Sequence, residues 1–265
     1  MQKTLLLSLP AVILAGQLTA QTSAPVFQTM TCVKAQPGKF TDYRDFVTST
    51  GPKLARVAID AGSYTTWTLL QSLRPSGEEA RCDFVISTLS EGAPPEPRNA
   101  GGQGLEQALA KAGVKMSAAD YLGKRDATSR LVSQEIWSMR IRVGTPQKGN
   151  YVFLNYMKVK DGPGYSKFES EVWRPMAEGW VKEGSQSAWV VASRVVPSGT
   201  DLAYAAYSAD IYPNWTAVFK PRNTQAMFGK VHGGKDYQET MGKLGALRDL
   251  ARRELYVVVD RTAKM

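Results

Sequence analysis

Hydrophobic and polar positions alternate along eight segments of the chain, four in each half. A period of two is typical of strands that bury one face, whereas helices repeat their apolar positions every three to four residues. Short turn sequences such as Pro75-Ser76-Gly77 join some of these segments into hairpins. The pattern predicts strands at 27–34, 63–73, 80–90, 135–143, 151–158, 185–196, 202–212 and 254–260.

Helical periodicity occupies most of the chain between these strands. It predicts helices at 40–61, 105–112, 117–132, 165–183, 214–220 and 236–252. Two of these helices end at a glycine, Gly62 or Gly184, a residue that suits the left-handed position after a helix. The same two helices contain Pro52 and Pro175, which predict a kink or a break because proline removes a helical hydrogen bond.

The chain contains an internal repeat with a long period. Five residues recur 122 positions later: Gly62, Trp67, Pro75, Ser76 and Gly77 return as Gly184, Trp189, Pro197, Ser198 and Gly199. Near the end of each half the spacing becomes 119, as between Glu135 and Glu254. Solenoid repeats run about 20–50 residues, so this period indicates duplicated domains. We expect them at 25–145 and 150–263, a size usual for a domain.

Each half has the element order β-α-β-β-α-β, which is the ferredoxin-like pattern. Alternating strands suit a sheet that carries helices on one face only. Two such units in one chain resemble the dimeric α+β barrel superfamily, over about residues 27–262. The resemblance implies an α+β fold in which two tandem ferredoxin-like repeats form a pseudo-dimeric barrel within one chain. A barrel interior that side chains do not fill can hold a ligand.

That superfamily includes monooxygenases of antibiotic biosynthesis, haem-degrading monooxygenases, chlorite dismutase-like and dye-decolorising peroxidases, and many ligand-binding proteins. Because one fold carries many activities, the resemblance does not decide whether this chain is an enzyme. The chain shows no Ser-His-Asp pattern, no glycine-rich phosphate loop and no metal-binding cluster. Three interpretations stay open: a barrel that binds a small apolar or aromatic molecule, a monooxygenase-like enzyme using the same cavity, and an interaction module with a packed barrel.

The N-terminus has the features of a secretory signal peptide. Lys3 precedes an apolar run from Leu5 to Gly16, and Ala20 is a small residue suited to cleavage. The run is too short to span a bilayer. We expect residues 1–20 to be removed and the protein to be exported, to the periplasm or outside the cell. A further segment, 91–104, is rich in proline and glycine and is predicted to be a mobile loop.

The formal net charge of the chain is +9. It favours weak attraction to anionic surfaces, whereas nucleic acid is not expected because no binding motif is present. We expect no transmembrane segment in the mature chain, which would be a monomer or a homodimer.

Two cysteines, Cys32 and Cys82, lie on strands that a ferredoxin-like sheet places side by side. A cross-strand disulfide and a pair of buried thiols are both open, and export permits the bond. The equivalent positions in the second half are Leu154 and Tyr204, so the duplicated fold does not require it.

Aromatic and polar residues provide the candidate cavity positions. The repeat-equivalent Trp67 and Trp189 either pack under the helices or face the barrel interior. The second half has an asparagine, a histidine and several tyrosines that the first half lacks at the equivalent positions. We therefore expect a site weighted toward the second half. The candidates for the cavity are Trp67, Trp189, Asn155, Tyr156, Tyr204 and Tyr207.

His232 is the only histidine. Its position loosely resembles that of the haem ligand in small haem-degrading monooxygenases. Those proteins also have an asparagine on the first strand, and Asn155 lies on the first predicted strand of the second half. Those proteins have a tryptophan where this chain has Ile211-Tyr212, and Trp215 comes slightly later. A solvated loop histidine is the alternative. No cofactor is predicted, and haem on His232 remains an alternative.

Overall fold

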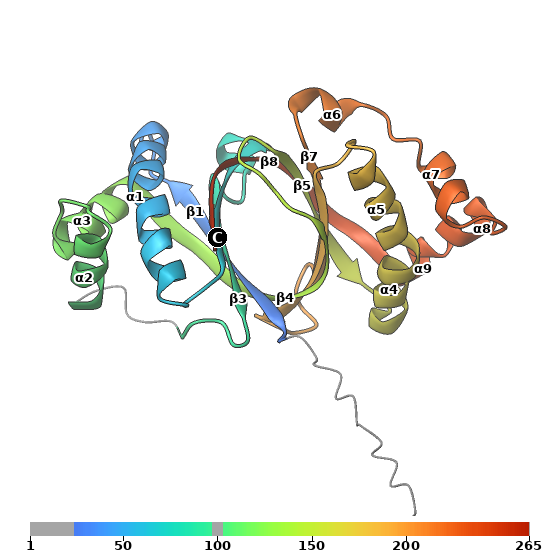
Figure 1. Ribbon diagram of the computed structural model, residues 1–265, viewed down its shortest axis with the longest axis horizontal. Helices are drawn as coiled ribbons and strands as arrows, with labels where there is room; N and C mark the ends of the chain where they lie inside the picture. Colours follow the sequence, from blue (N-terminus) through green and yellow to red (C-terminus); the bar gives the residue numbers. More distant parts are fainter. Residues whose placement is uncertain (1–23, 97–102, 265) are drawn as a thin grey trace, which may run out of the picture.

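Eight antiparallel strands close into one barrel in the computed structural model, which describes residues 24–96 and 103–264 (Figure 1). Around the barrel the strand order is β1-β3-β2-β8-β5-β7-β6-β4. The strands are β1 (Val26–Ala35), β2 (Thr66–Arg74), β3 (Phe84–Glu91), β4 (Ser129–Gly144), β5 (Tyr151–Val159), β6 (Ala188–Val196), β7 (Ala206–Tyr212) and β8 (Arg248–Ala263). The α+β class is therefore confirmed.

Each half of the chain contributes one four-stranded part of the barrel. The first half has the order β4-β1-β3-β2, and the second has the corresponding order β8-β5-β7-β6. The two parts join where β2 pairs with β8 and where β4 pairs with β6. Because the edge strands of the two parts pair at both junctions, the barrel has no open edge.

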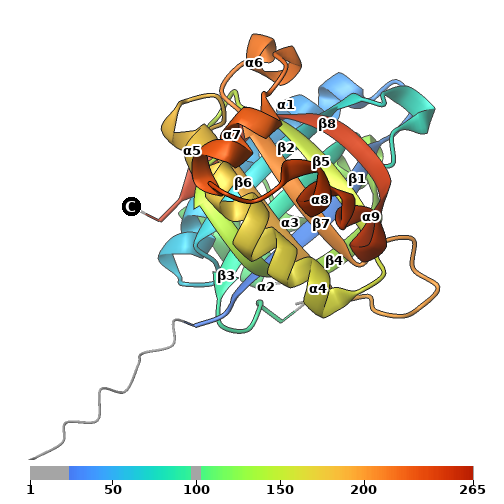
Figure 2. The same ribbon diagram turned by 90° about the vertical axis from the view of Figure 1, so that its right-hand side faces the viewer.

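The helices lie outside the barrel, in a layer on each side (Figures 1 and 2). Those of the first half are α1 (Phe40–Asp60), α2 (Gln103–Lys111) and α3 (Ala118–Thr128). Those of the second half are α4 (Gly162–Phe168), α5 (Arg174–Lys182), α6 (Trp215–Phe219), α7 (Thr224–Val231), α8 (Tyr237–Gly242) and α9 (Leu244–Leu247). A π-helical turn at Glu169–Trp173 links α4 to α5. Of the helices in the described residues, none has the length and apolar character needed to cross a bilayer.

The main differences from the predicted elements occur in the first residues of β4 and β8, the last strand of each half. Residues 129–134 and 248–253 were predicted mostly as helix, but they pair with the ends of β1 and β5 instead. Pairing along a neighbouring strand outweighs the weak helical preference of such short segments. α1 runs without a break through Pro52, and α7 was not predicted at all. The predicted signal peptide and residues 97–102 of the predicted loop lie outside the described residues.

Trp67 belongs to the packing between the sheet and α1, which corrects its assignment to the cavity. It lies in a buried cluster with Phe46 and Val47 of α1. A Cβ atom at Gly51 of the same helix would come within 2.8 Å of the Trp67 ring, so the absent side chain lets helix and indole approach. Trp189 packs in the same way with Ala177 beneath α5, but, unlike Trp67, it is also among the residues that line the cavity inside the barrel. Both tryptophans therefore hold helices onto the barrel.

Candidate functional site

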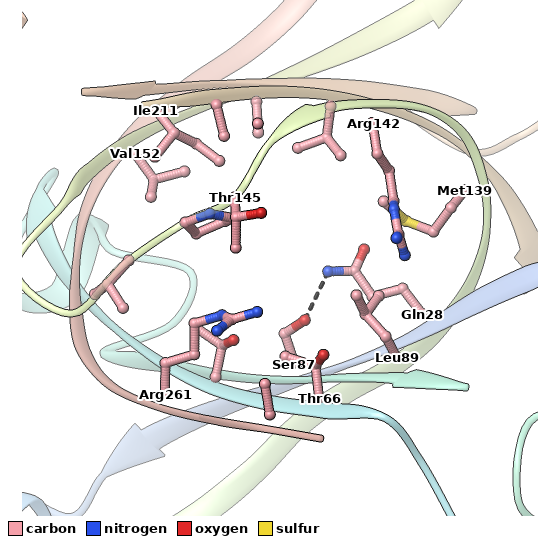
Figure 3. Close-up of a pocket in the computed structure, with 18 of the residues that line it drawn as sticks. Gln28, Thr66, Ser87, Leu89, Met139, Arg142, Thr145, Val152, Ile211 and Arg261 are labelled. Carbon is pink, nitrogen blue, oxygen red and sulfur yellow. Dashed lines mark hydrogen bonds between the residues drawn. The ribbon is translucent and has the colours of Figure 1, made fainter. Parts of the chain in front are cut away.

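One end of the barrel encloses a chamber of about 350 Å³ (Figure 3). This volume lies in the range of about 300–1,000 Å³ that is usual for small-molecule sites. The second half of the chain supplies an aliphatic wall. Its side chains are Val152, Leu154, Ala188, Val190, Ala209 and Ile211. Such a wall favours an apolar surface of a ligand, because burying it removes it from water.

The opposite wall comes from the first half and is more polar. Gln28 donates from Nε2 to Oγ of Ser87 at 2.6 Å, and Tyr207 donates its hydroxyl to Oε1 of Gln28. Thr66 and Thr68 continue this polar face along β2. Burial raises the pKa of Tyr207 well above its ordinary value, so its hydroxyl stays protonated at neutral pH. The site is asymmetric, as expected, but its polar groups come mainly from the first half rather than the second.

The other end of the barrel is closed by a group of residues that we call the plug: Arg81, Glu135, Trp137, Tyr156, Arg194 and Tyr204. Tyr204 donates to Oε1 of Glu135 at 2.8 Å, and Arg81 donates to the hydroxyl of Tyr156 at 2.9 Å. The Arg194 guanidinium lies 4.2 Å from the centre of the Tyr204 ring. Tyr156 and Tyr204 thus contribute to a closed end and not to the chamber, whereas Tyr207 reaches the chamber.

The disulfide lies at the same end as the plug. Cys32 and Cys82 are joined in the structure, and the two residues are 3% and 0% exposed. They belong to the interior cluster that also contains Tyr156 and Trp137. The bond therefore ties β1 to the segment before β3 inside the barrel wall.

Asn155 lies on the helix side of the sheet, which corrects its assignment to the barrel cavity. It donates to Asp210 at 3.0 Å and accepts from Nε of Arg253 at 2.6 Å. The space beside it is only about 80 Å³. Burial raises the pKa of Glu169, in the π-helical turn beside this space, to about 7. The cluster is a tightly bonded polar layer with no room for an aromatic ligand.

His232 does not fit the role of a haem ligand. It caps the C-terminus of α7, its ring contacts Phe228 at a centroid distance of 4.8 Å, and Nε2 lies 3.0 Å from the carbonyl oxygen of Val172. It is 8% exposed and does not line the chamber. Within residues 24–96 and 103–264, no group of three or more His, Cys, Asp or Glu side chains is placed to hold a metal ion. We therefore derive no chemistry through haem.

Comparison with known proteins supports the fold. No protein-family model matches the chain, and no curated protein matches it in sequence. Among solved structures, a presumed monooxygenase of Fusobacterium nucleatum aligns over 91% of this chain and 95% of its own, with a TM-score of 0.55 and 10% identity. A presumed monooxygenase of Lactobacillus acidophilus (14% identity, 91% and 96% coverage) and an anthrone oxidase-like protein (13% identity, 92% and 94% coverage) each reach 0.49.

The Fusobacterium nucleatum protein shares the fold of this chain, and the α+β barrel that the sequence resemblance implied is confirmed as a fold. At this identity the likeness concerns the fold alone. Any chemistry of this chain depends on the residues of its own chamber.

Two arginines at the chamber rim were not among the site residues predicted from the sequence. Arg142 of β4 and Arg261 of β8 line the chamber from opposite walls (Figure 3). They are 119 residues apart, the same spacing that relates Glu135 to Glu254. This shared spacing is the signal in the sequence that relates the two arginines.

Proposed function

We propose that the protein binds a small, largely apolar organic molecule in the barrel chamber. The observation that carries the proposal is the aliphatic wall of the second half facing an open volume of about 350 Å³. A chamber of this size does not suit a purely structural module with a packed barrel, since protein interiors are otherwise filled to crystal-like density. The plug at the other end would leave the chamber end as the route for the ligand.

A filling substitution tests the proposal. Val190→Phe would add a ring from the half-buried Val190 into the chamber. We expect it to weaken binding of the neutral fluorescent molecule N-phenyl-1-naphthylamine by about tenfold or more, because the ring occupies the space of the ligand. The measurement is a fluorescence titration.

Val195→Phe is the matched control, since it places the same ring at an exposed position of the same strand. It should bind the naphthylamine as the wild type does. Equal affinities in all three proteins would show that the chamber is not the binding site. Circular dichroism at increasing temperature checks that both variants are folded.

A monooxygenase-like reaction in the same chamber is the second candidate. It is supported by the fold shared with the presumed monooxygenase of Fusobacterium nucleatum. The hydroxyl of Tyr207 and the amide of Gln28 would then orient an oxygenated ring. Oxygen consumption in the presence of a hydroxylated aromatic compound, lost in Val190→Phe, would favour it; no consumption would favour binding alone.

We also propose that the protein is exported and that its halves arose by duplication. Export is supported by the N-terminal sequence, and duplication by the recurring residues and the corresponding strand orders. Mass spectrometry of the protein recovered from the periplasm or the medium should find Gln21 as the first residue. A mature chain that still begins at Met1 would contradict export by a cleaved signal.

A further inference from the structure

Two β-bulges turn arginines into the chamber. In β4 the pairing with β6 shifts between Met139 and Ile141, which leaves Arg140 as an extra residue. Before the shift Met139 faces the chamber, whereas after it Ile141 packs on the helix side and Arg142 faces the chamber. Bulges commonly re-aim a side chain in this way.

The same device recurs in β8. Its pairing with β2 shifts between Val258 and Asp260, which leaves Val259 as the extra residue. Val259 packs on the helix side beneath α1, and Arg261 faces the chamber opposite Thr68. Figure 3 shows Arg142 and Arg261 reaching into the chamber from opposite sides. The two bulges thus place a pair of related cations across one space.

Neither guanidinium has an anionic partner within the described part of the chain. By contrast, other buried or half-buried arginines have a carboxylate partner: Arg81 and Arg194 pair with Glu135, and Arg222 pairs with Asp210. The only bond from Arg261 to an acidic side chain comes from its main-chain nitrogen, to Asp260. Burial without a carboxylate beside the guanidinium lowers the pKa of Arg261. An arginine pair held in this way is suited to an incoming anion.

The remaining charges at the rim leave the balance positive. Lys264 and Glu91 also line the chamber, and both are exposed. With Arg142 and Arg261 they make three cations against one carboxylate. Arg142 is exposed as well, whereas Arg261 is half-buried. Salt screens exposed charges, but a ligand enclosed between the two arginines would be screened less.

We propose that the chamber selects an organic carboxylate, whose apolar body lies on the second-half wall and whose carboxylate lies between Arg142 and Arg261. Planar guanidinium groups match the two oxygens of a carboxylate better than a single point charge does. The side chains of Gln28 and Ser87 also line the chamber and would receive a further polar substituent (Figure 3). The inference rests on the proposed function and names the class of its ligand.

The test compares two ligands of one shape, naphthalene-2-carboxylate and the neutral 2-naphthylmethanol, by isothermal titration calorimetry. We expect the carboxylate to bind more tightly to the wild type. Arg142→Gln and Arg261→Gln should each weaken carboxylate binding about tenfold, and the double variant should weaken it further, because each removes a charge-assisted hydrogen bond. Binding of the alcohol should stay nearly unchanged. Arg44→Gln, at an exposed position of α1, is the control that removes one positive charge elsewhere.

The outcomes separate the two proposals. Equal binding of the carboxylate and the alcohol, with no loss in the double variant but loss of both in Val190→Phe, would overturn the carboxylate inference and leave chamber binding in place. Carboxylate affinity that falls equally in Arg44→Gln would also overturn it, as a general effect of net charge. If Val190→Phe changes neither ligand's affinity, the proposed function fails as well.

Discussion

Loss of the disulfide between Cys32 and Cys82 should lower the free energy of unfolding by about 4 kcal/mol. The two residues are 50 positions apart, and a cross-link over a loop of that size removes much conformational entropy from the unfolded chain. Both residues are buried in the interior cluster, so their replacement would also disturb packing at the plug end. Urea unfolding of the double variant Cys32→Ala/Cys82→Ala, compared with the wild type, measures the loss.

A reductant provides the matched control. Dithiothreitol should lower the urea midpoint of the wild type and leave that of the double variant unchanged. Because both cysteines are almost fully buried, the native protein should be reduced slowly until urea opens the barrel. If the fully reduced wild type kept its midpoint, with reduction verified by thiol titration, the bond would contribute nothing to stability.

Glu135→Ala should destabilise the fold by roughly 3–5 kcal/mol, because it leaves a buried cation without its partner. The side chains of Glu135 and Arg194 are only 6% and 4% exposed, and their charged atoms lie 3.6 Å apart. Arg81 and the hydroxyl of Tyr204 also depend on the same carboxylate oxygen. The free energy of unfolding, again from urea titration, is the quantity to compare.

Glu178→Ala is the control for this substitution. Glu178 pairs with Arg174 on α5, and both side chains are about half exposed, so its loss should cost less than about 1 kcal/mol. The double variant Glu135→Leu/Arg194→Met should recover part of the stability lost in Glu135→Ala, since a buried ion pair can be replaced by apolar groups at little cost. Equal destabilisation by Glu135→Ala and Glu178→Ala would mean that the plug is not a buried ionic group.

Alternation along the chain was sufficient to predict that eight strands exist and, with the repeat, the class of fold, but it missed the first six residues of β4 and β8. An alternating pattern indicates that a strand has two different faces, but it does not indicate which face lies inside a barrel. Thr66 and Trp67 illustrate this limit: the larger and more apolar side chain lies under α1, and the threonine lines the chamber. The choice depends on the space that Gly51 leaves on the helix, which is a contact between distant segments.

The rim of the site was harder to predict for a second reason. A bulge shifts the alternation by one residue, so a simple reading of β4 from Trp137 and Met139 would place Arg142 outside the barrel. Asn155 was placed inside the barrel although it lies on the helix side. Its sequence neighbours gave no indication of its partners Asp210 and Arg253, which lie on adjacent strands. Strand pairing and register decide both cases, and neither is visible in one sequence.

The most direct test of ligand binding in the chamber is a crystal structure of the protein grown with naphthalene-2-carboxylate. We expect density for the rings against Val152, Val190 and Ile211, with the carboxylate between Arg142 and Arg261. Density for the compound only on the outer surface, or a chamber filled by protein side chains, would contradict it.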